Sequence, residues 1–362
     1  MNLSIKLTNQ IPLTLTKKLL LKKLLEIFYD RKLTINITLF QVFCLEKLKF
    51  YAIFIKNLNL KWKIMKSYTL NNIPKPIIDL HTHSTFSDGT LSPKEIINLA
   101  KKLQLKAIAL TDHDTVGGIP HFLKAAENCD DIRAVPGVEI SSTLFNREIH
   151  IVGLFVDYRN EVLTQFLQKQ RLARQKRNVK IIKKLQNHGY DITIEELKER
   201  IDSDAIGRPH IAALLIEKDY FSNPQEIFEQ LLRRGKPCFE PRPLPTVAEA
   251  INCIHQANGL AIWAHPVYQP RRGQRHQTKK LAKKMQTLGL DAIEAYYTVY
   301  TPQQQEMIKS IASELNLLES GGSDFHGGNQ PTIELGKGYG SLAVPFQVYE
   351  KMLEFINSKE DI

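Results

Sequence analysis

The stretch that decides the fold is Ile77-Ile78-Asp79-Leu80-His81-Thr82-His83-Ser84, in which an apolar run ends directly in two histidines. Further side chains of the kinds that bind metal ions lie at or near the ends of other apolar runs: Asp88, His113, Glu139, His150, His265, Asp324 and His326. A parallel α/β barrel carries its chemistry at the C-terminal ends of its strands. The pattern therefore predicts a barrel in which these side chains meet at one end.

Short apolar runs alternate with helical stretches from about residue 75 onward, which is typical of βα units. We expect strands over residues 77–80, 106–111, 132–139, 149–156, 260–264, 291–297 and 317–321. We expect helices over residues 93–103, 116–128, 161–188, 193–201, 209–218, 224–234, 246–258, 302–315 and 345–357.

The alternation stops between residues 160 and 245, where the pattern is helical throughout and no metal-type cluster occurs. We interpret this region as a helical insertion within one barrel. The chain then has four parts: a basic N-terminal extension (1–74), the first part of the barrel (75–159), the insertion (160–245) and the second part of the barrel (246–362).

The positive charge is concentrated near the N-terminus. Residues 1–70 hold thirteen of the 49 Lys/Arg and three of the 38 Asp/Glu, which leaves 36 and 35 in the rest. The net charge of +11 is therefore no global sign of nucleic-acid binding, and any phosphate affinity must be local. We expect residues 1–74 to lie outside the working protein, with Met65 as the natural start. A basic amphipathic membrane anchor is the alternative.

The composition narrows the class of protein. Apolar residues make up 43% and charged residues 24%, which is typical of globular domains. The four cysteines have no CxxC spacing, so neither a disulfide framework nor a thiolate zinc site is expected, and a cytoplasmic location fits best. No stable membrane insertion is expected, because no apolar run reaches about 18 residues, and nothing indicates an obligate protein partner.

The nine side chains suit a metal cluster. His81-x-His83 places two imidazoles on one side of a strand, and Asp324-x-His326 repeats this spacing with a carboxylate. Mixed imidazole and carboxylate ligands favour Mn, Fe or Zn. The carboxylate of Glu139 could bridge two ions, which together stabilise both oxygens of an in-line phosphoryl displacement. The alternative is a set of ordinary core and loop residues.

Six motifs resemble those of the PHP (polymerase and histidinol phosphatase) metal-dependent phosphoesterases, over about residues 77–345. They are Asp79-Leu80-His81-Thr82-His83-Ser84, Ser87-Asp88-Gly89, Leu110-Thr111-Asp112-His113-Asp114, Gly137-Val138-Glu139, Trp263-Ala264-His265-Pro266 and Gly322-Ser323-Asp324-Phe325-His326. The resemblance implies a distorted (β/α)₇ barrel and hydrolysis by a metal-bound hydroxide. It also implies up to three divalent ions, with Mn²⁺ expected and Fe, Zn or Mg as alternatives.

The resemblance also implies how the ligands are shared. The first ion would be held by His81, His83, Glu139 and Asp324. The second would be held by Glu139, His150 and His265, and the third by Asp88, His113 and His326. Position 88 is His in some branches of the family, and Asp there keeps a ligand.

The insertion indicates the substrate class. Gly207-Arg208-Pro209-His210 resembles a segment of the PHP subfamily that includes nucleoside 3′,5′-bisphosphate phosphatases and enzymes that release 5′ nucleotides from RNA ends. The resemblance implies that Arg208 clamps a phosphate that is not cleaved; a solvated Arg at a helix start is the alternative. Arg174, on a basic stripe of the long helix, and Lys236, in the separate basic run Arg233-Arg234-Gly235-Lys236, are further candidate substrate contacts, although such runs are commonly solvated faces.

Several other residues near the predicted mouth of the barrel have candidate roles. Four aromatic residues could stack bases or simply pack: Tyr296, Tyr297, Tyr300 and Phe325. Three carboxylates are expected to orient ligand imidazoles: Asp79, Asp112 and Asp114. His121 and His210 match no metal motif and are expected to be structural or to support the site.

Three alternative functions stay open. One is a phosphatase for a small metabolite such as histidinol phosphate, against which the large basic insertion argues. Another is a DNA nuclease, which would need a partner because the chain has no polymerase region. The third is a metal-stabilised binding module without catalysis, against which the retention of all nine ligand-type residues argues.

Overall fold

A computed structural model describes residues 77–127, 129, 131–200, 205–267 and 273–360. The chain divides into two units, Met1–Ile73 and Pro74–Ile362, and every described residue lies in the second unit. The expectations for residues 1–74 therefore fall outside the described residues. None of the helices in the described part combines the length and the apolar character that a membrane span needs.

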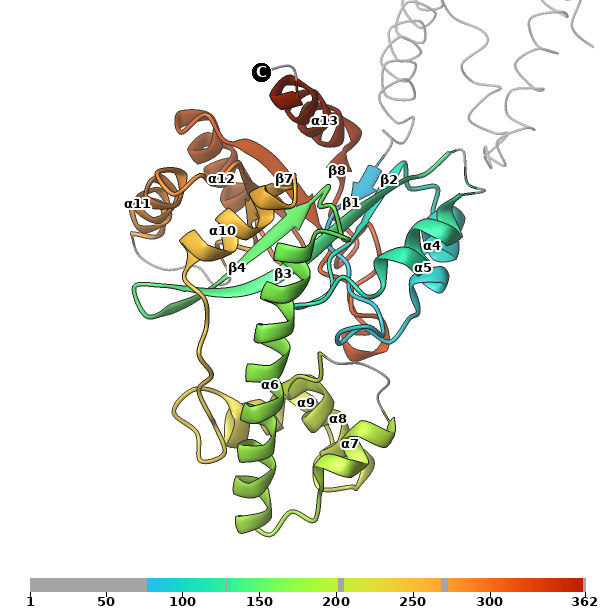
Figure 1. The fold of residues 1–362 in the computed structure, drawn as a ribbon, viewed down its shortest axis with the longest axis vertical. Helices are drawn as coiled ribbons and strands as arrows, with labels where there is room; N and C mark the ends of the chain where they lie inside the picture. The colour runs from blue at the N-terminus through green and yellow to red at the C-terminus, as the bar shows by residue number, and fades with distance from the viewer. Residues whose placement is uncertain (1–76, 128, 130, 201–204, 268–272, 361–362) are drawn as a thin grey trace, which may run out of the picture. The chain divides into compact units, whose positions relative to one another are not determined.

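One eight-stranded sheet forms the centre of the protein, in the order β7-β6-β5-β4-β3-β2-β1-β8 (Figure 1). The strands are β1 (Ile77–Asp79), β2 (Ala107–Leu110), β3 (Arg133–Leu144), β4 (Arg147–Leu154), β5 (Leu260–Trp263), β6 (Ala292–Tyr297), β7 (Leu318–Gly322) and β8 (Val344–Pro345). Neighbours pair in parallel except around β4, which is antiparallel to β3 and β5, and at β8, which is antiparallel to β1.

The sheet nearly closes into a barrel. Just after β1, the amide of Leu80 donates to the carbonyl of Gly321 in β7 at 3.1 Å, and beyond both strands Thr82 forms a parallel bridge with Phe325. The segments that follow the two outer parallel strands therefore lie side by side. The predicted distorted α/β barrel is confirmed, with β8 as a short additional strand.

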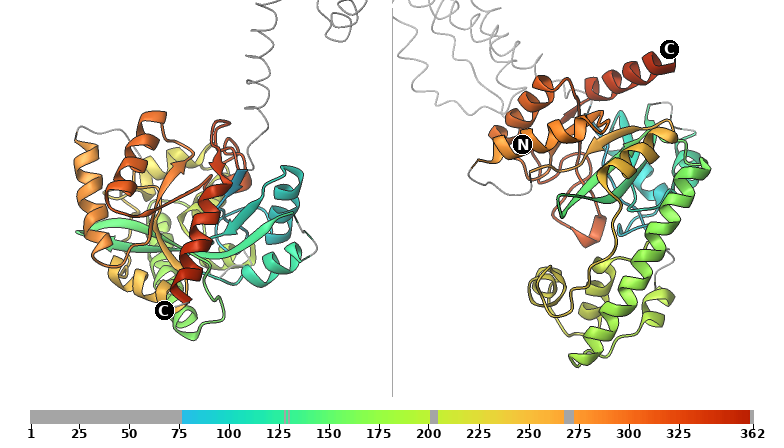
Figure 2. Two further views of the ribbon diagram at one scale, coloured as in Figure 1. Left: turned by 90° about the horizontal axis from the view of Figure 1, so that it is seen from above. Right: turned by 60° about the vertical axis from the view of Figure 1, so that its left-hand side comes forward.

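Helices surround the outside of the sheet (Figure 2), so strands such as β2 and β5 are buried along their whole length and are apolar throughout. The helices are α4 (Pro93–Lys102), α5 (Ile119–Ala126), α10 (Val247–Gln256), α11 (Gln274–Gln286), α12 (Pro302–Glu314) and α13 (Phe346–Glu360). Ser92 and Glu95 form the capping box that begins α4, and Thr246 and Glu249 form the one that begins α10.

The β3–β4 hairpin is the main departure from the expected βα pattern. The two strands pair along eight positions, with Gly137 opposite Leu154 and Leu144 opposite Arg147. Because β4 runs antiparallel, its first half lies at the same end of the sheet as the last residues of the parallel strands. This is why His150, near the start of its strand, joins side chains that follow the ends of theirs.

The insertion is helical, as predicted. It consists of α6 (Glu161–Asn187), α7 (Ile194–Arg200), α8 (Arg208–Glu217) and α9 (Pro224–Ile227), which continues as a π-helical turn, Phe228–Leu232. Leu163 and Leu167 of α6 pack in the barrel core, whereas Ile181 and Leu185 pack in a second, smaller core with α7 and α8. The helix thus bridges both cores, as Figure 1 shows.

Candidate metal centre

The nine predicted ligands converge at the barrel end where the parallel strands finish. His81, His83 and Asp88 follow β1, and His113 follows β2. Glu139 lies in β3 and His150 in β4. The remaining three residues follow β5 and β7: His265, Asp324 and His326.

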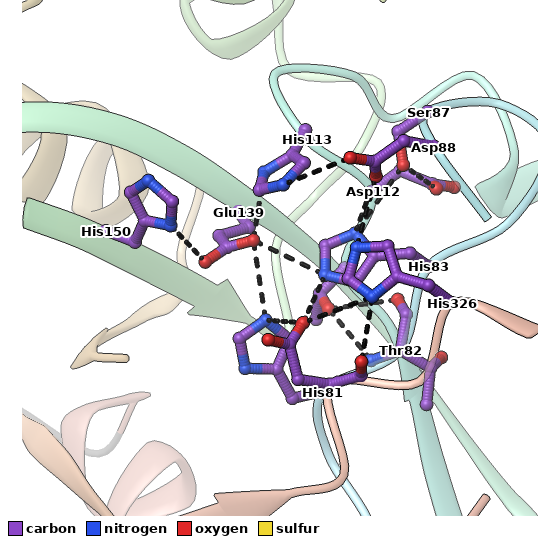
Figure 3. Close-up of polar contacts among 12 residues, drawn as sticks. His81, Thr82, His83, Ser87, Asp88, Asp112, His113, Glu139, His150 and His326 are labelled. Atoms are coloured by element: carbon purple, nitrogen blue, oxygen red, sulfur yellow. Dashed lines mark hydrogen bonds and ion pairs between the residues drawn. The ribbon is translucent and has the colours of Figure 1, made fainter. Parts of the chain in front are cut away.

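Glu139 lies at the centre of the cluster, and Figure 3 shows its carboxylate between the rings of His81, His113 and His150. Its Oε2 is 2.9 Å from His113 Nδ1, 3.3 Å from His83 Nε2 and 3.4 Å from His81 Nε2. Its Oε1 is 2.8 Å from His150 Nδ1 and 3.1 Å from His265 Nε2. Burial alone would raise the pKa of Glu139, but the surrounding imidazoles hold it well below its usual range.

Two further carboxylates flank the imidazoles. Asp88 Oδ1 lies 3.3 Å from His326 Nε2, and its Oδ2 lies 3.8 Å from His113 Nε2. Asp324 Oδ1 lies 3.2 Å from His83 Nε2 and 3.6 Å from His81 Nε2. A third ring nitrogen lies 3.9 Å from Asp88, on His83, and 3.6 Å from Asp324, on His326. Each carboxylate therefore faces three ring nitrogens, as a ligand shared around a cation would.

Unpaired polar atoms show that the cluster suits cations. Five of its buried atoms have no hydrogen-bond partner among the described residues: His81 Nε2, His83 Nε2, Asp88 Oδ1, His113 Nδ1 and Glu139 Oε2. Buried polar atoms in folded proteins nearly always form hydrogen bonds, so a set that forms none, although its nitrogens and oxygens face one another at short distances, is unusual. Imidazole nitrogens and carboxylate oxygens are the donor atoms that Mn, Fe and Zn accept.

Potential ligand atoms form three sets, and within each set all the atoms lie within 4.8 Å of one another. These sets agree in part with the predicted sharing of ligands between ions. One joins His81, His83 and Glu139, as expected for the first ion. A second joins Asp88, His113 and His326, as expected for the third ion, and adds His83. The last joins Glu139, His150 and His113; it does not include His265, whose Nε2 lies 3.1 Å from Glu139 Oε1.

Of the three predicted orienting carboxylates, Asp79 and Asp112 bind backbone and hydroxyl groups and Asp114 binds guanidinium groups, rather than imidazole rings. Asp79 accepts hydrogen bonds from the amides of Ser323 and Gly336, and this joins β1 to the segments after β7. Asp112 accepts from the amide of Ser84 at 2.7 Å. Asp114 binds the arginines of the insertion.

One carboxylate that does contact a ligand ring is Glu294, which the sequence analysis missed. Its Oε1 lies 3.1 Å from His81 Nδ1, and its Oε2 accepts the backbone amide of His265 at 2.6 Å. The side chain is 2% exposed. A single acid within Ala292-Ile293-Glu294-Ala295, an otherwise apolar strand, was the available signal.

A cavity of about 650 Å³ opens beside the cluster. Asp88, His113, His150 and His265 of the cluster line it. Four arginines line it as well: Arg174, Arg177, Arg208 and Arg242. Lys236 is exposed and does not line this cavity.

The four arginines outnumber the acids that face them. Asp114 is fully buried and receives Arg174 at 2.5 Å and Arg242 at 3.1 Å. Glu148 also lines the cavity, 3.6 Å from His150. Burial, together with the charge of the neighbouring arginines, lowers the pKa of the Arg177 guanidinium to about 8.

Arg208 lies at the first turn of α8, where the resemblance placed a phosphate clamp. Its guanidinium lies about 6 Å from the ring centroids of Phe228 and Phe239 and donates to the carbonyl of Leu232 at 3.3 Å. It is half-buried against the cavity rather than pointing away from it.

The candidate aromatic residues pack instead of lining this cavity. Tyr297 donates to Asp324 at 2.8 Å, and the hydroxyl of Tyr300 accepts the amide of Val267. Tyr296 and Phe325 are buried. Of the two unassigned histidines, His210 accepts the amide of Gly207 at the start of α8, and His121 stacks on Phe86.

Comparisons with known proteins agree with this architecture. Residues 79–235 match the PHP domain. The chain is 37% identical over 275 residues to a 5′-3′ exoribonuclease of Haemophilus influenzae, covering 75% of this chain and 98% of that protein. It is 30% identical over 257 residues to a 3′,5′-nucleoside bisphosphate phosphatase of Chromobacterium violaceum, covering 69% and 87%.

A solved structure described as a metal-dependent phosphoesterase, from Bifidobacterium adolescentis, superposes with a TM-score of 0.67 at 27% identity and covers 76% of this chain and 95% of that one. The barrel, its cluster of candidate metal ligands and these relatives together define a metal-dependent phosphoesterase. The chain belongs to the PHP domain family.

Proposed function

We propose that this protein hydrolyses the 3′-phosphate of nucleoside 3′,5′-bisphosphates and releases nucleotides from the 5′ ends of RNA. Both substrates carry a scissile phosphate and a second phosphate one nucleoside away. The proposal needs a site for each of these two phosphates. The names of the exoribonuclease and bisphosphate phosphatase relatives are consistent with it.

The observation that carries the proposal is the distribution of unpaired buried atoms. Eight buried side-chain atoms lack a hydrogen-bond partner within the described residues, and five of them belong to residues that line the same cavity: Asp88, His113, Arg174, Arg177 and Arg242. The other three, on His81, His83 and Glu139, belong to the cluster beside it. Of the eight atoms, five are the cluster atoms given above, and three are donors of the arginine group: Arg174 Nε, Arg177 Nε and Arg242 Nη1. Atoms that can bind cations thus lie near N–H donors that can bind an anion.

The proposed ligands are the nine predicted residues, shared as the resemblance implies, with Mn²⁺ as the proposed ion. Divalent ions held there would lower the pKa of a water molecule and offset the charge of the scissile phosphate. The protein's own contribution is to fix the second phosphate. Guanidinium groups bind phosphate oxygens through paired hydrogen bonds, and Arg208 and Arg177 have no carboxylate within ion-pair distance in the described part of the chain.

Charge also selects the substrate. Four guanidiniums face two carboxylates, Asp114 and Glu148, so the arginine side of the cavity carries an excess of positive charge. Burying such an excess is unfavourable unless an anion compensates it. A second phosphate supplies this compensation, and binding it orients the scissile phosphate toward the cluster. A monophosphate would leave the arginines uncompensated.

A panel assay with Mn²⁺ tests the proposal. The substrates are 3′,5′-bisphosphoadenosine, adenosine 3′-monophosphate, histidinol phosphate, 5′-phosphorylated RNA and 5′-phosphorylated DNA. We expect hydrolysis of the bisphosphate and the RNA, with the 3′-monophosphate much slower. Preference for histidinol phosphate would favour the small-metabolite phosphatase. Preference for DNA would favour a DNA nuclease. Hydrolysis of none, despite bound metal, would favour a binding module.

A further inference from the structure

The tip of the β3–β4 hairpin carries an exposed aromatic residue. Leu144 pairs with Arg147, so Phe145 and Asn146 alone form the turn. Phe145 is 67% exposed, the highest value among the exposed large hydrophobic side chains of the described residues. Its ring therefore contributes little to either hydrophobic core.

The backbone of this turn is unfavourable for phenylalanine. Phe145 has a φ of 50° and Asn146 a φ of 59°, as in the type I′ turn, whose first position favours Asn, Asp or Gly. A bulky residue at positive φ is rare because its Cβ crowds the backbone. Residues that go against the conformational preference of their position without improving the packing are common at functional sites.

Arginines lie at and next to this turn. Arg234 Nη1 donates to the carbonyl of Asn146 at 3.3 Å, which places its guanidinium at the turn. Arg147 and Arg233 are exposed as well, and neither forms an ion pair with another described residue. The tip is held in place at its base, where the amide of Thr143 donates to Pro245 at 2.8 Å.

The hairpin connects this tip to the metal centre. His150 belongs to the cluster, and Arg147 and Glu148 line the same cavity. From the level of His150 to the turn the strand covers four residues, about 13 Å at the usual rise. A chain that leaves the cavity along the hairpin thus reaches Phe145 beyond its first nucleotide.

Resting on the function proposed above, we propose that the hairpin tip binds the downstream part of single-stranded RNA. Phe145 stacks on a base downstream of the second nucleotide, and Arg147 and Arg234 bind the neighbouring phosphates. Single-strand binders combine base stacking on aromatic rings with basic side chains along the backbone in this way. The surface accounts for a longer substrate than the cavity of about 650 Å³ can hold.

The test compares substrates of increasing length on the full-length chain with Mn²⁺. kcat/KM is measured for 3′,5′-bisphosphoadenosine and for 5′-phosphorylated RNA of two and ten nucleotides, with wild type, Phe145→Gly and the ring-retaining control Phe145→Tyr. We expect wild type to favour the decanucleotide. Phe145→Gly should lower kcat/KM for it about tenfold, the size of one lost stacking contact, and leave the bisphosphate unchanged. Phe145→Tyr should behave as wild type.

Thermal unfolding separates binding from a structural role. Because Gly adopts positive φ without strain, Phe145→Gly should raise or preserve Tm while it lowers kcat/KM for the decanucleotide. Arg234→Gln should also reduce the salt dependence of RNA binding, by a slope of about 0.7 for one lost phosphate contact. Equal kcat/KM of wild type for the two RNA lengths would overturn the inference and leave the proposed function standing. An equal loss of kcat/KM for the bisphosphate and the RNA in Phe145→Gly would overturn the inference in the same way. Wild type inactive on all three substrates would instead refute the proposed function.

Discussion

The substitution Glu294→Gln tests how the protein positions its candidate metal ligands. The carboxylate of Glu294 faces two donors, the Nδ1 of His81 and the backbone amide of His265. A glutamine of the same shape has one acceptor oxygen, so its NH₂ group must face one of these donors. The variant therefore loses one charge-assisted hydrogen bond and frees the His81 ring to rotate.

The expected size follows from that loss. A hydrogen bond to a charged group contributes about 1.5–3 kcal/mol, which is roughly a 10- to 150-fold change in an equilibrium constant. Residues that orient a metal-ligating histidine typically change metal affinity by about 10- to 100-fold. We therefore expect Glu294→Gln to bind its most weakly held Mn²⁺ about 10- to 100-fold less tightly, measured by competition with a chelator and by metal content after dialysis.

Asp291→Asn is the matched control. Asp291, three residues earlier, also contacts one imidazole and one backbone amide, His255 Nε2 at 2.7 Å and Ala261 N at 2.8 Å, but neither residue belongs to the cluster. Asp291→Asn should lower the stability of the fold about as much as Glu294→Gln does, because it loses a comparable hydrogen bond. It should leave metal affinity unchanged. Unchanged metal affinity in Glu294→Gln, or an equal loss in both variants, would refute the positioning role of Glu294.

Three further substitutions have defined outcomes. His83→Ala should nearly abolish hydrolysis while circular dichroism shows a folded protein, because His83 Nε2 has no hydrogen-bond partner to lose among the described residues. Arg208→Ala should lower kcat/KM for the bisphosphate about 10- to 100-fold with little effect on a 3′-monophosphate. Its control is Arg200→Ala, which replaces an exposed arginine that pairs with Glu217. An unchanged preference for the bisphosphate in Arg208→Ala would remove Arg208 from the substrate site. Asp114→Asn should destabilise the fold by about 3–5 kcal/mol in urea unfolding, because it leaves Arg174 and Arg242 uncompensated. Although burial opposes ionisation, these arginines lower the pKa of Asp114 to about 2, so the contribution is present above the unfolded pKa of about 3.9. The difference from wild type should therefore shrink as the pH falls from about 4 to 2, and a difference that does not change with pH would contradict the ion-pair account.

Repeated spacing made much of the barrel and its cluster predictable from the sequence. Apolar runs that end in His81-x-His83 and Asp324-x-His326 give both a strand and the direction of its side chains. The antiparallel direction of β4 was not predictable in this way, because alternation along a strand is the same in either direction. The pattern located His150 but not the reason that it reaches the cluster.

Two elements were missed because they carry little periodic signal. Helix α11 begins Gln274-Arg275-His276-Gln277 and buries only Thr278, Ala282 and Met285, so its apolar face is narrow. Strand β8 has two residues. Conversely, the helix predicted over residues 224–234 ends early as α9 and continues as a π-helical turn, which a 3.6-residue period does not describe.

The substrate side of the cavity was less predictable than the metal side. Arg177 and Arg174 lie three residues apart on one face of α6, yet the same spacing also occurs on solvated faces. Arg242 comes from a separate loop, and only the tertiary structure brings it to Asp114. Lys236 belongs to a basic run with a similar appearance and lies outside the cavity.

The most direct measurement of the central claim is a crystal structure grown with Mn²⁺, with anomalous diffraction recorded at the manganese edge. The account predicts anomalous peaks between Glu139 and the imidazoles that surround it, with Asp88 and Asp324 among the ligands. Full metal loading by elemental analysis with every peak elsewhere on the protein would contradict it.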